Sequence, residues 1–163
     1  MMIKIIAIDP GYDRVGIALL AKENNQKEKV LFSETFISNR NEDIYQRLFA
    51  IGDRFSFLVK KYQPDFFVTE SLFFSKNTKT ALHVAELRGI LFYLAKKNNL
   101  EIYEFTPNQI KLAITSNGRA EKKDILFMLP YLIKLPERKE KYIDDELDAL
   151  AIGLTFFASY RKK

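Results

Sequence analysis

The fold is decided by the stretch Ile5-Ile6-Ala7-Ile8-Asp9-Pro10-Gly11. A short apolar run that is rich in β-branched residues and ends at Pro-Gly is typical of a buried strand. The run brings the carboxylate of Asp9 to the end of that strand, where it leaves the core. Because an ionised carboxylate is costly to bury unless it is paired or binds a cation, further carboxylates at this edge would indicate a cation site.

The composition is that of an ordinary globular protein with a modest excess of positive charge. The chain has 163 residues, 47% of them hydrophobic and 29% charged, and 26 Lys and Arg outnumber 21 Asp and Glu. This length predicts a single domain over residues 1–160, followed by a basic tail at 161–163. The chain lacks a membrane-spanning apolar run and a signal-peptide layout, so we expect a cytoplasmic protein without membrane contact.

The residue types limit the kind of metal site that the chain can form. Cysteine is absent and His83 is the only histidine, which excludes thiolate sites and His-rich zinc sites within one chain. A bound metal would therefore have mainly oxygen ligands, which favours Mg²⁺ or Mn²⁺. The net charge of +5 is weak evidence for a polyanionic partner, and an ordinary basic surface explains it as well.

The order of apolar runs predicts a mixed α/β sheet. Besides the first run, strands are expected over 15–20, 30–37, 66–70 and 101–105. Helices are expected over about 44–62, 80–98, 107–114, 121–132 and 144–160. Three antiparallel strands followed by two parallel strands, with helices between them, give a five-stranded mixed sheet flanked by helices. Asn39 or Asn41 is the expected cap of the first helix.

Three further carboxylates are candidates for the same edge of the sheet. Glu70 ends the run at 66–70, so adjacent parallel strands would place it beside Asp9. Asp145 and Asp148 are three residues apart on the last helix and therefore share a face, which the apolar residues after them press towards the sheet. Acids at a helix N-terminus also complement the helix dipole, but that simpler alternative does not explain Asp9 and Glu70.

Four converging carboxylates would repel one another unless cations neutralised them. Two Mg²⁺ ions about 4 Å apart are a common solution, and they suit phosphodiester hydrolysis. One ion activates a water molecule as the nucleophile, and the other stabilises the leaving oxygen. Together with the basic surface, this predicts a metal-dependent nuclease.

Five sequence blocks occur in a fixed order along the chain. They are I-D-P-G at 8–11, E-S-L-F-F-S-K-N at 70–77, T-P-N-Q-I-K at 106–111, N-G-R-A-E-K at 117–122 and D-E-L-D-A-L-A at 145–151. This ordered set resembles the RuvC family of Holliday-junction resolvases over nearly the whole chain, from about Ile3 to Phe157. One such block alone would be a weak signal, whereas the ordered set is specific.

The resemblance implies a ribonuclease H-like fold and a homodimer that cuts four-way junction DNA in recombination and DNA repair. It implies Mg²⁺-dependent nicks, two ions per active site with Mn²⁺ as a substitute, in two strands of like polarity, leaving 5′-phosphate and 3′-hydroxyl ends. It also implies work with a RuvA–RuvB type branch-migration complex. The implied metal ligands are Asp9, Glu70, Asp145 and Asp148. Asp144 is also within reach of Asp148, and local geometry leaves its part in the site open.

The resemblance further implies a set of DNA contacts. Lys111 and Lys122 match basic positions near the scissile phosphate, Lys122 as a catalytic residue, and Phe73 matches an aromatic residue that inserts at the crossover. The remaining candidates for DNA binding are Lys76, Gly118 and Arg119. An exposed aromatic ring can stack on an unpaired base. The alternatives are that Phe73 packs into the core, as we expect for Phe74, and that Lys76 is simply solvated.

The sequence departs from the family in one turn and leaves two rival functions open. The family's G-x-G-x-A reads Ser116-Asn117-Gly118-Arg119-Ala120 here, so the first glycine of that turn is replaced by serine. A ribonuclease H-like RNA-processing nuclease shares the first block and an acidic late helix. The other rival is an inert nucleic-acid-binding domain, although such a domain has no reason to retain four carboxylates that it must desolvate. The first turn is not a Walker A motif, because Gly16 is followed by Ile-Ala.

Overall fold

The computed structural model of the chain describes residues 2–24, 26–71 and 78–161, without the side chains of 78–80. Phe73, Phe74 and Lys76 lie outside these residues, as do positions 162 and 163 of the expected basic tail. Within the described part, the strands form one sheet in the order β3-β2-β1-β4-β5. The strands are β1 (Met2–Asp9), β2 (Arg14–Glu23), β3 (Lys29–Ile37), β4 (Phe66–Glu70) and β5 (Glu101–Phe105). The predicted mixed sheet is confirmed.

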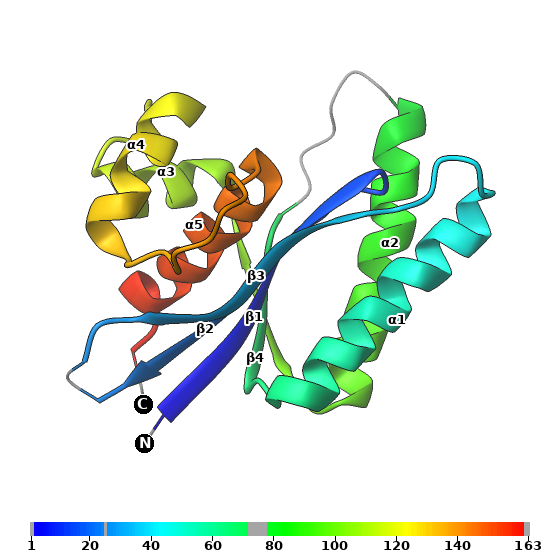
Figure 1. Cartoon of the computed structure of the whole chain (residues 1–163), viewed down its shortest axis with the longest axis horizontal. Coiled ribbons are helices and arrows are strands. Elements are labelled where there is room, and N and C mark those ends of the chain that lie inside the picture. The colour runs from blue at the N-terminus through cyan, green and yellow to red at the C-terminus, as the bar shows by residue number, and fades with distance from the viewer. Residues whose placement is uncertain (1, 25, 72–77, 162–163) are drawn as a thin grey trace.

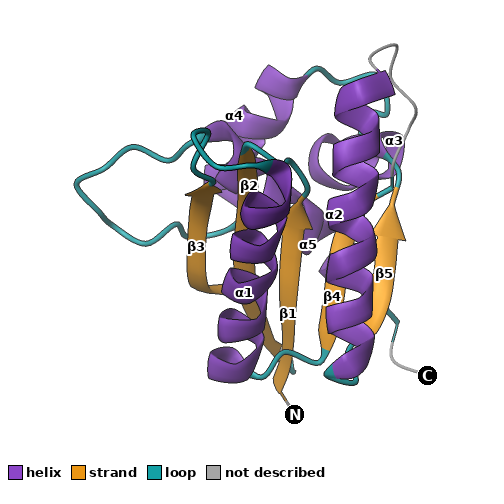
Figure 2. Ribbon diagram, turned by 90° about the vertical axis from the view of Figure 1, so that its right-hand side faces the viewer, coloured by secondary structure: helices purple, strands orange, loops and turns teal. Residues whose placement is uncertain are grey.

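Helices cover both faces of this sheet. They are α1 (Ile44–Tyr62), α2 (Thr78–Lys97), α3 (Pro107–Thr115), α4 (Lys122–Leu132) and α5 (Asp144–Ser159). Figure 1 shows α1 and α2 on one side of the sheet and α3, α4 and α5 on the other. Figure 2 looks onto α1 and α2 with the strands behind them. In the parts of the chain that the structure describes, no helix is long and apolar enough to cross a membrane.

Strand β1 lies at the centre of the fold. It pairs antiparallel with β2 and parallel with β4, and Ile5 to Ile8 are at most 1% exposed. Its side chains alternate between the two faces. Ile5 and Ala7 pack in the core with α5, whereas Ile6 and Ile8 pack in the core with α1 and α2. This double burial explains why the strand is a continuous apolar run, and it fixes where Asp9 leaves the core.

The cap of α1 differs from the prediction. Asp43, not Asn39 or Asn41, has the extended cap conformation, and its carboxylate accepts a hydrogen bond of 2.9 Å from the Gln46 amide. The side chain of Asn39 instead accepts a hydrogen bond of 3.1 Å from the Asn41 amide in the preceding turn. Asp and Asn have similar cap preferences, so local sequence does not decide which of them the chain uses.

Helix α5 packs closely on the sheet because glycines lie at two contacts. A Cβ atom on Gly153 would lie 2.2 Å from Leu20 Cδ1 and 3.3 Å from Ala7 Cβ. A Cβ atom on Gly16 would lie 1.8 Å from the Asp145 carbonyl oxygen. The first contact fixes the middle of α5 over β1 and β2, and the second fixes its acidic first turn.

We predict that Gly153→Ala lowers the free energy of unfolding by about 1–3 kcal/mol, because the added methyl group overpacks the core. Gly89→Ala is the matched control, since Gly89 is also in a helix but has no neighbour within 4 Å of an added Cβ. The control should raise stability by up to about 1 kcal/mol through helix propensity. Urea unfolding followed by circular dichroism measures both. Equal stability of the two variants would contradict this close packing.

Candidate active site

Two carboxylates leave the core side by side at the ends of adjacent strands. β1 and β4 run parallel, with Ile8 opposite Thr69, and the hydroxyl of Thr69 donates a 3.0 Å hydrogen bond to the Ile8 carbonyl. Asp9 and Glu70 each follow directly in sequence. The prediction that Asp9 and Glu70 lie at the ends of adjacent parallel strands is confirmed.

Helix α5 brings a third carboxylate to this edge, where the side chains surround a small cavity. Asp9, Glu70 and Asp148 line a cavity of about 280 Å³ together with Lys111 and Lys122. Apolar and proline residues of α3, α4 and α5 form the rest of its wall. Three acids and two lysines that are far apart in the sequence therefore share one pocket.

The negative charges of the acids in this cavity are only partly neutralised by the neighbouring lysines. Burial, together with the charges of Asp148, Glu70 and Asp145, raises the pKa of Asp9 to about 7, and Lys122 opposes this rise. Burial also raises the pKa of Glu70 and of Asp148. Such values show that the site favours the binding of a proton or a cation.

The two lysines approach the carboxylates from α3 and α4. Lys122 Nζ donates a 2.7 Å hydrogen bond to Asp148 Oδ2 and lies 3.8 Å from Asp144 Oδ2. Burial alone would lower the pKa of Lys122, but its hydrogen bond to Asp148 and the surrounding acids raise it. The charge of Lys111 lowers the pKa of Glu70 and so opposes the effect of burial. Both ammonium groups can contact a substrate anion beside the acids.

Helix capping holds the elements that carry these lysines. Thr106 and Gln109 form a reciprocal capping box at the start of α3, with hydrogen bonds of 2.8 and 3.2 Å. The Glu121 amide donates a 2.8 Å hydrogen bond to Asp124 Oδ2 at the start of α4. Lys122 follows immediately, so its backbone is fixed beside the cavity.

The fourth predicted ligand, Asp145, has a different position. It does not line the cavity, and its carboxylate forms an ion pair with Arg14 of β2. Asp144 is 62% exposed at its side chain, and its Oδ2 lies 3.8 Å from Lys122 Nζ. Among the residues that the structure describes, no three acidic or histidine side chains are grouped as a ready metal site. The three acids that line the cavity still suit a hard divalent cation, because Asp9, Glu70 and Asp148 are carboxylates whose pKa is raised.

Local hydrogen bonds hold the turn between α3 and α4, in which Ser116 takes the place of the first glycine of the family pattern. Ser116 has a φ of 58°, a left-handed conformation that favours glycine, and its amide donates a 2.9 Å hydrogen bond to the Leu112 carbonyl. The Asn117 side chain accepts a 3.0 Å hydrogen bond from the Arg119 amide. Gly118 has open space on its Cβ side and Arg119 is exposed, outside the cavity lining.

Sequence reasoning missed two arginines that touch this site. Arg88 of α2 is buried, donates to the Glu70 carbonyl and to the Glu104 carboxylate, and stacks on the Phe92 ring at 5.0 Å. It therefore holds the end of β4. In the sequence, the available signal for a buried role of Arg88 was its position next to the apolar Leu87 in the helix expected over 80–98. Arg14 precedes the strand expected over 15–20 and is the first residue of β2 in the structure, and nothing in the local sequence connects it with Asp145.

Comparison with known proteins gives one consistent family. The family model described as crossover junction endodeoxyribonuclease RuvC matches residues 5–156. A protein of that name from Petrotoga mobilis is 41% identical over 147 residues, which are 90% of this chain and 88% of the relative. Another from Thermosipho melanesiensis is 39% identical over 150 residues, or 92% and 94% of the two chains.

A solved structure gives the same result for the fold. The Thermus thermophilus RuvC in complex with a Holliday junction substrate superimposes with a TM-score of 0.84 at 25% identity. The match covers 95% of this chain and 93% of the Thermus chain. This likeness confirms the ribonuclease H-like fold that the sequence resemblance implied.

We predict that Asp9→Asn stabilises the metal-free protein at pH 8 by about 1–3 kcal/mol. Burial raises the pKa of Asp9 from 3.8 to about 7, so between these pH values the folded state holds a proton that the unfolded state has lost. At pH 8 the buried carboxylate is charged, and the folded state bears the full cost of that charge. Wild-type stability should therefore fall as the pH rises from about 4 to about 7, and Asp9→Asn should remove that loss.

Urea unfolding in EDTA at pH 4 and pH 8 measures this effect. The exposed Glu42 offers a control, because Glu42→Gln removes a charge from a residue that does not line the cavity. The stabilisation by Asp9→Asn should be present at pH 8 and small at pH 4. A loss of stability in Asp9→Asn at pH 8 would contradict the claim that the charged Asp9 carboxylate destabilises the folded protein.

Proposed function

The chain belongs to the RuvC family of crossover junction endodeoxyribonucleases, and we propose that it resolves Holliday junctions by paired symmetric nicks in two strands of like polarity. The observation that supports this most directly is the cavity in which Asp9, Glu70 and Asp148 meet two lysines. Carboxylates with raised pKa values suit cation-assisted phosphodiester hydrolysis, and the lysines suit the phosphate. We propose that the products carry 5′-phosphate and 3′-hydroxyl ends.

Asp9, Glu70 and Asp148 would hold divalent cations, Mg²⁺ or Mn²⁺, with Asp145 joining them from the first turn of α5. When bound, the cations supply an activated water and charge stabilisation for the leaving oxygen. The protein fixes the carboxylates on two rigid strand ends and one packed helix, so little reorganisation is needed at the strand ends. Lys122 and Lys111 bind the phosphate from the opposite wall, where their charges oppose the build-up of negative charge.

The wider DNA surface follows from what adjoins the cavity. Gly118 and Arg119 lie in the exposed turn that leads into Lys122, which makes them suitable for contact with the DNA backbone. Phe73 and Lys76 come three and six residues after Glu70, the last residue of β4, in the sequence. We propose that Phe73 stacks at the junction crossover and that Lys76 contacts phosphate.

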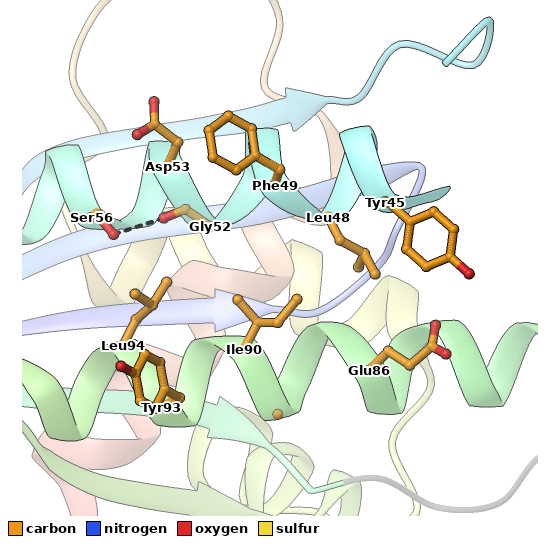
Figure 3. A pocket seen from close by; sticks show the side chains of 11 residues that line it. Tyr45, Leu48, Phe49, Gly52, Asp53, Ser56, Glu86, Ile90, Tyr93 and Leu94 are labelled. Carbon is orange, nitrogen blue, oxygen red and sulfur yellow. Dashed lines mark hydrogen bonds between the residues drawn. The ribbon is translucent and has the colours of Figure 1, made fainter. Parts of the chain in front are cut away.

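Two paired nicks require two active sites, and we propose that a second copy of the chain supplies the other one. A groove of about 840 Å³ between α1 and α2 supports this (Figure 3). Three of its lining side chains are strongly exposed aromatics: Tyr45 at 78%, Phe49 at 71% and Tyr93 at 65%. Exposed apolar patches of this kind mark protein interfaces. The groove lies across the sheet from α3, α4 and α5, so a partner there leaves the cavity open to DNA.

Family membership also supports a functional partner. We propose that a RuvA–RuvB type branch-migration complex delivers the junction to the dimer. No surface of the described residues is assigned to that contact.

The direct test of the function is cleavage of a labelled synthetic four-way junction in Mg²⁺, beside matched duplex, single-stranded DNA and RNA. Paired symmetric nicks that are confined to the junction are expected. Cleavage of RNA instead would favour the RNA-processing nuclease, and tight junction binding without cleavage in Mg²⁺ or Mn²⁺ would favour the inert binding domain. Both of these results contradict the proposal.

We predict that Asp148→Asn lowers junction cleavage by at least about 100-fold, because it removes a cation ligand at the reacting phosphate. Junction binding in Ca²⁺ should stay within about threefold of wild type, since Asp148 is not a DNA contact. The exposed Glu137 gives a matched control, with Glu137→Gln expected to retain cleavage. Single-turnover cleavage and fluorescence anisotropy measure the two quantities. Wild-type cleavage by Asp148→Asn would contradict the site assignment.

We predict that Phe49→Glu converts the dimer into a monomer by placing a charge in the apolar groove. Sedimentation velocity gives the mass of wild type and variant. Phe127→Glu is the matched control, because Phe127 of α4 is 67% exposed but lies on the other side of the sheet. A wild-type protein that is monomeric at micromolar concentration, or a dimer that survives Phe49→Glu, would contradict the assigned interface.

A further inference from the structure

Arg14 lies beside the acidic first turn of α5, although it belongs to a different part of the chain. It is the first residue of β2, and Gly16 is two residues further along the same strand. Side chains two residues apart in a strand point to the same face of the sheet. Since the Asp145 backbone packs against Gly16, Arg14 leaves the sheet on the face where α5 begins.

The guanidinium of Arg14 forms an ion pair with the carboxylate of Asp145. The Arg14 side chain is 44% exposed and that of Asp145 is 24% exposed. The contact uses one nitrogen, Nη2, and one carboxylate oxygen. Among the residues that the structure describes, most of the five N–H donors of this guanidinium have no other acceptor.

Two positively charged side chains, one from α4 and one from β2, therefore pair with the acidic residues of α5. Lys122 of α4 pairs with Asp148 at 2.7 Å, and Arg14 of β2 pairs with Asp145. Asp145 is the one predicted ligand that does not line the cavity. The ion pair explains this, because its carboxylate is directed to β2 rather than to Asp9.

We propose that Arg14 is a phosphate-binding residue of the active site, and that its guanidinium holds Asp145 until a divalent cation takes that carboxylate. A guanidinium can bind two phosphate oxygens at once, which suits the backbone of the strand being cut. This inference deepens the proposed function and rests on it for the identity of the phosphate. Arg14 and the lysines would then contact DNA on either side of the carboxylates.

A purely structural ion pair is the alternative. A pair with this exposure contributes little to stability, so Arg14→Gln should leave the unfolding temperature within about 2 °C of wild type. The matched control is Arg40→Gln, because Arg40 is 72% exposed and pairs at 3.3 Å with Asp13, and neither residue lines the cavity. A fold that depended on Arg14 would show a large fall in unfolding temperature for Arg14→Gln alone, and that result would overturn the proposal.

Cation binding is measured without DNA, by titrating Mn²⁺ and following free Mn²⁺ with electron paramagnetic resonance. Arg14→Gln should bind Mn²⁺ about two- to fivefold more tightly than wild type, because the competing cation has been removed. Arg40→Gln should bind it as wild type does. Unchanged or weaker Mn²⁺ binding by Arg14→Gln would overturn the role of Arg14 as a counter-ion. This readout does not depend on the substrate, so it stands apart from a failure of the proposed function.

Phosphate binding is measured from the salt dependence of junction binding in Ca²⁺. Arg14→Gln should lower the slope of log affinity against log salt by about one, the loss of one phosphate contact. Arg14→Lys should restore the slope, because a lysine keeps the charge. A slope equal to wild type in Arg14→Gln would overturn the phosphate contact. If the wild type does not prefer the junction to duplex, the proposed function fails, whereas the slope still reports on Arg14.

Discussion

The active site depends on a fold that holds mutually repelling carboxylates close together at one edge of the sheet. Asp9 is fixed because β1 is buried on both faces, and Glu70 is fixed because β4 pairs beside it. Helix α5 adds Asp148, held by close packing at Gly153. Burial and mutual repulsion raise the pKa of Asp9 to about 7, so the folded core stabilises an arrangement that is unfavourable without a cation. This cost is what makes the site suited to binding one.

The two faces of the sheet carry different features. On one face, α3, α4 and α5 bring Lys111, Lys122 and Asp148 to the strand-end acids Asp9 and Glu70. On the other face, α1 and α2 present exposed aromatic residues around their groove (Figures 1 and 3). Alternate side chains of β1 enter both cores, so one strand connects the two faces. We expect this separation to let a dimer form without covering either cavity. In the function that we propose, Lys122 and Arg14 lie between these acids and the bound DNA.

Sequence patterns predicted the elements well because their signals are local. Apolar run length and the residues that end each run located β1 and β4, and helical spacing placed Asp145 and Asp148 on one face of α5. The partners of those acids depend on tertiary packing and could not be predicted. The pairing of Arg14 with Asp145 spans 131 residues, and Arg88 reaches the end of β4 from α2. The cap at Asp43 was missed because neighbouring Asn residues have the same preference.

The most direct test of the central claim is the position of bound Mn²⁺ in crystals of the protein, located by its anomalous scattering. The account predicts a peak between Asp9, Glu70 and Asp148, with Asp145 turned away from Arg14 towards it. Mn²⁺ bound only at other carboxylates, with the Asp9 cavity empty at high Mn²⁺ concentration and pH 8, would contradict the account.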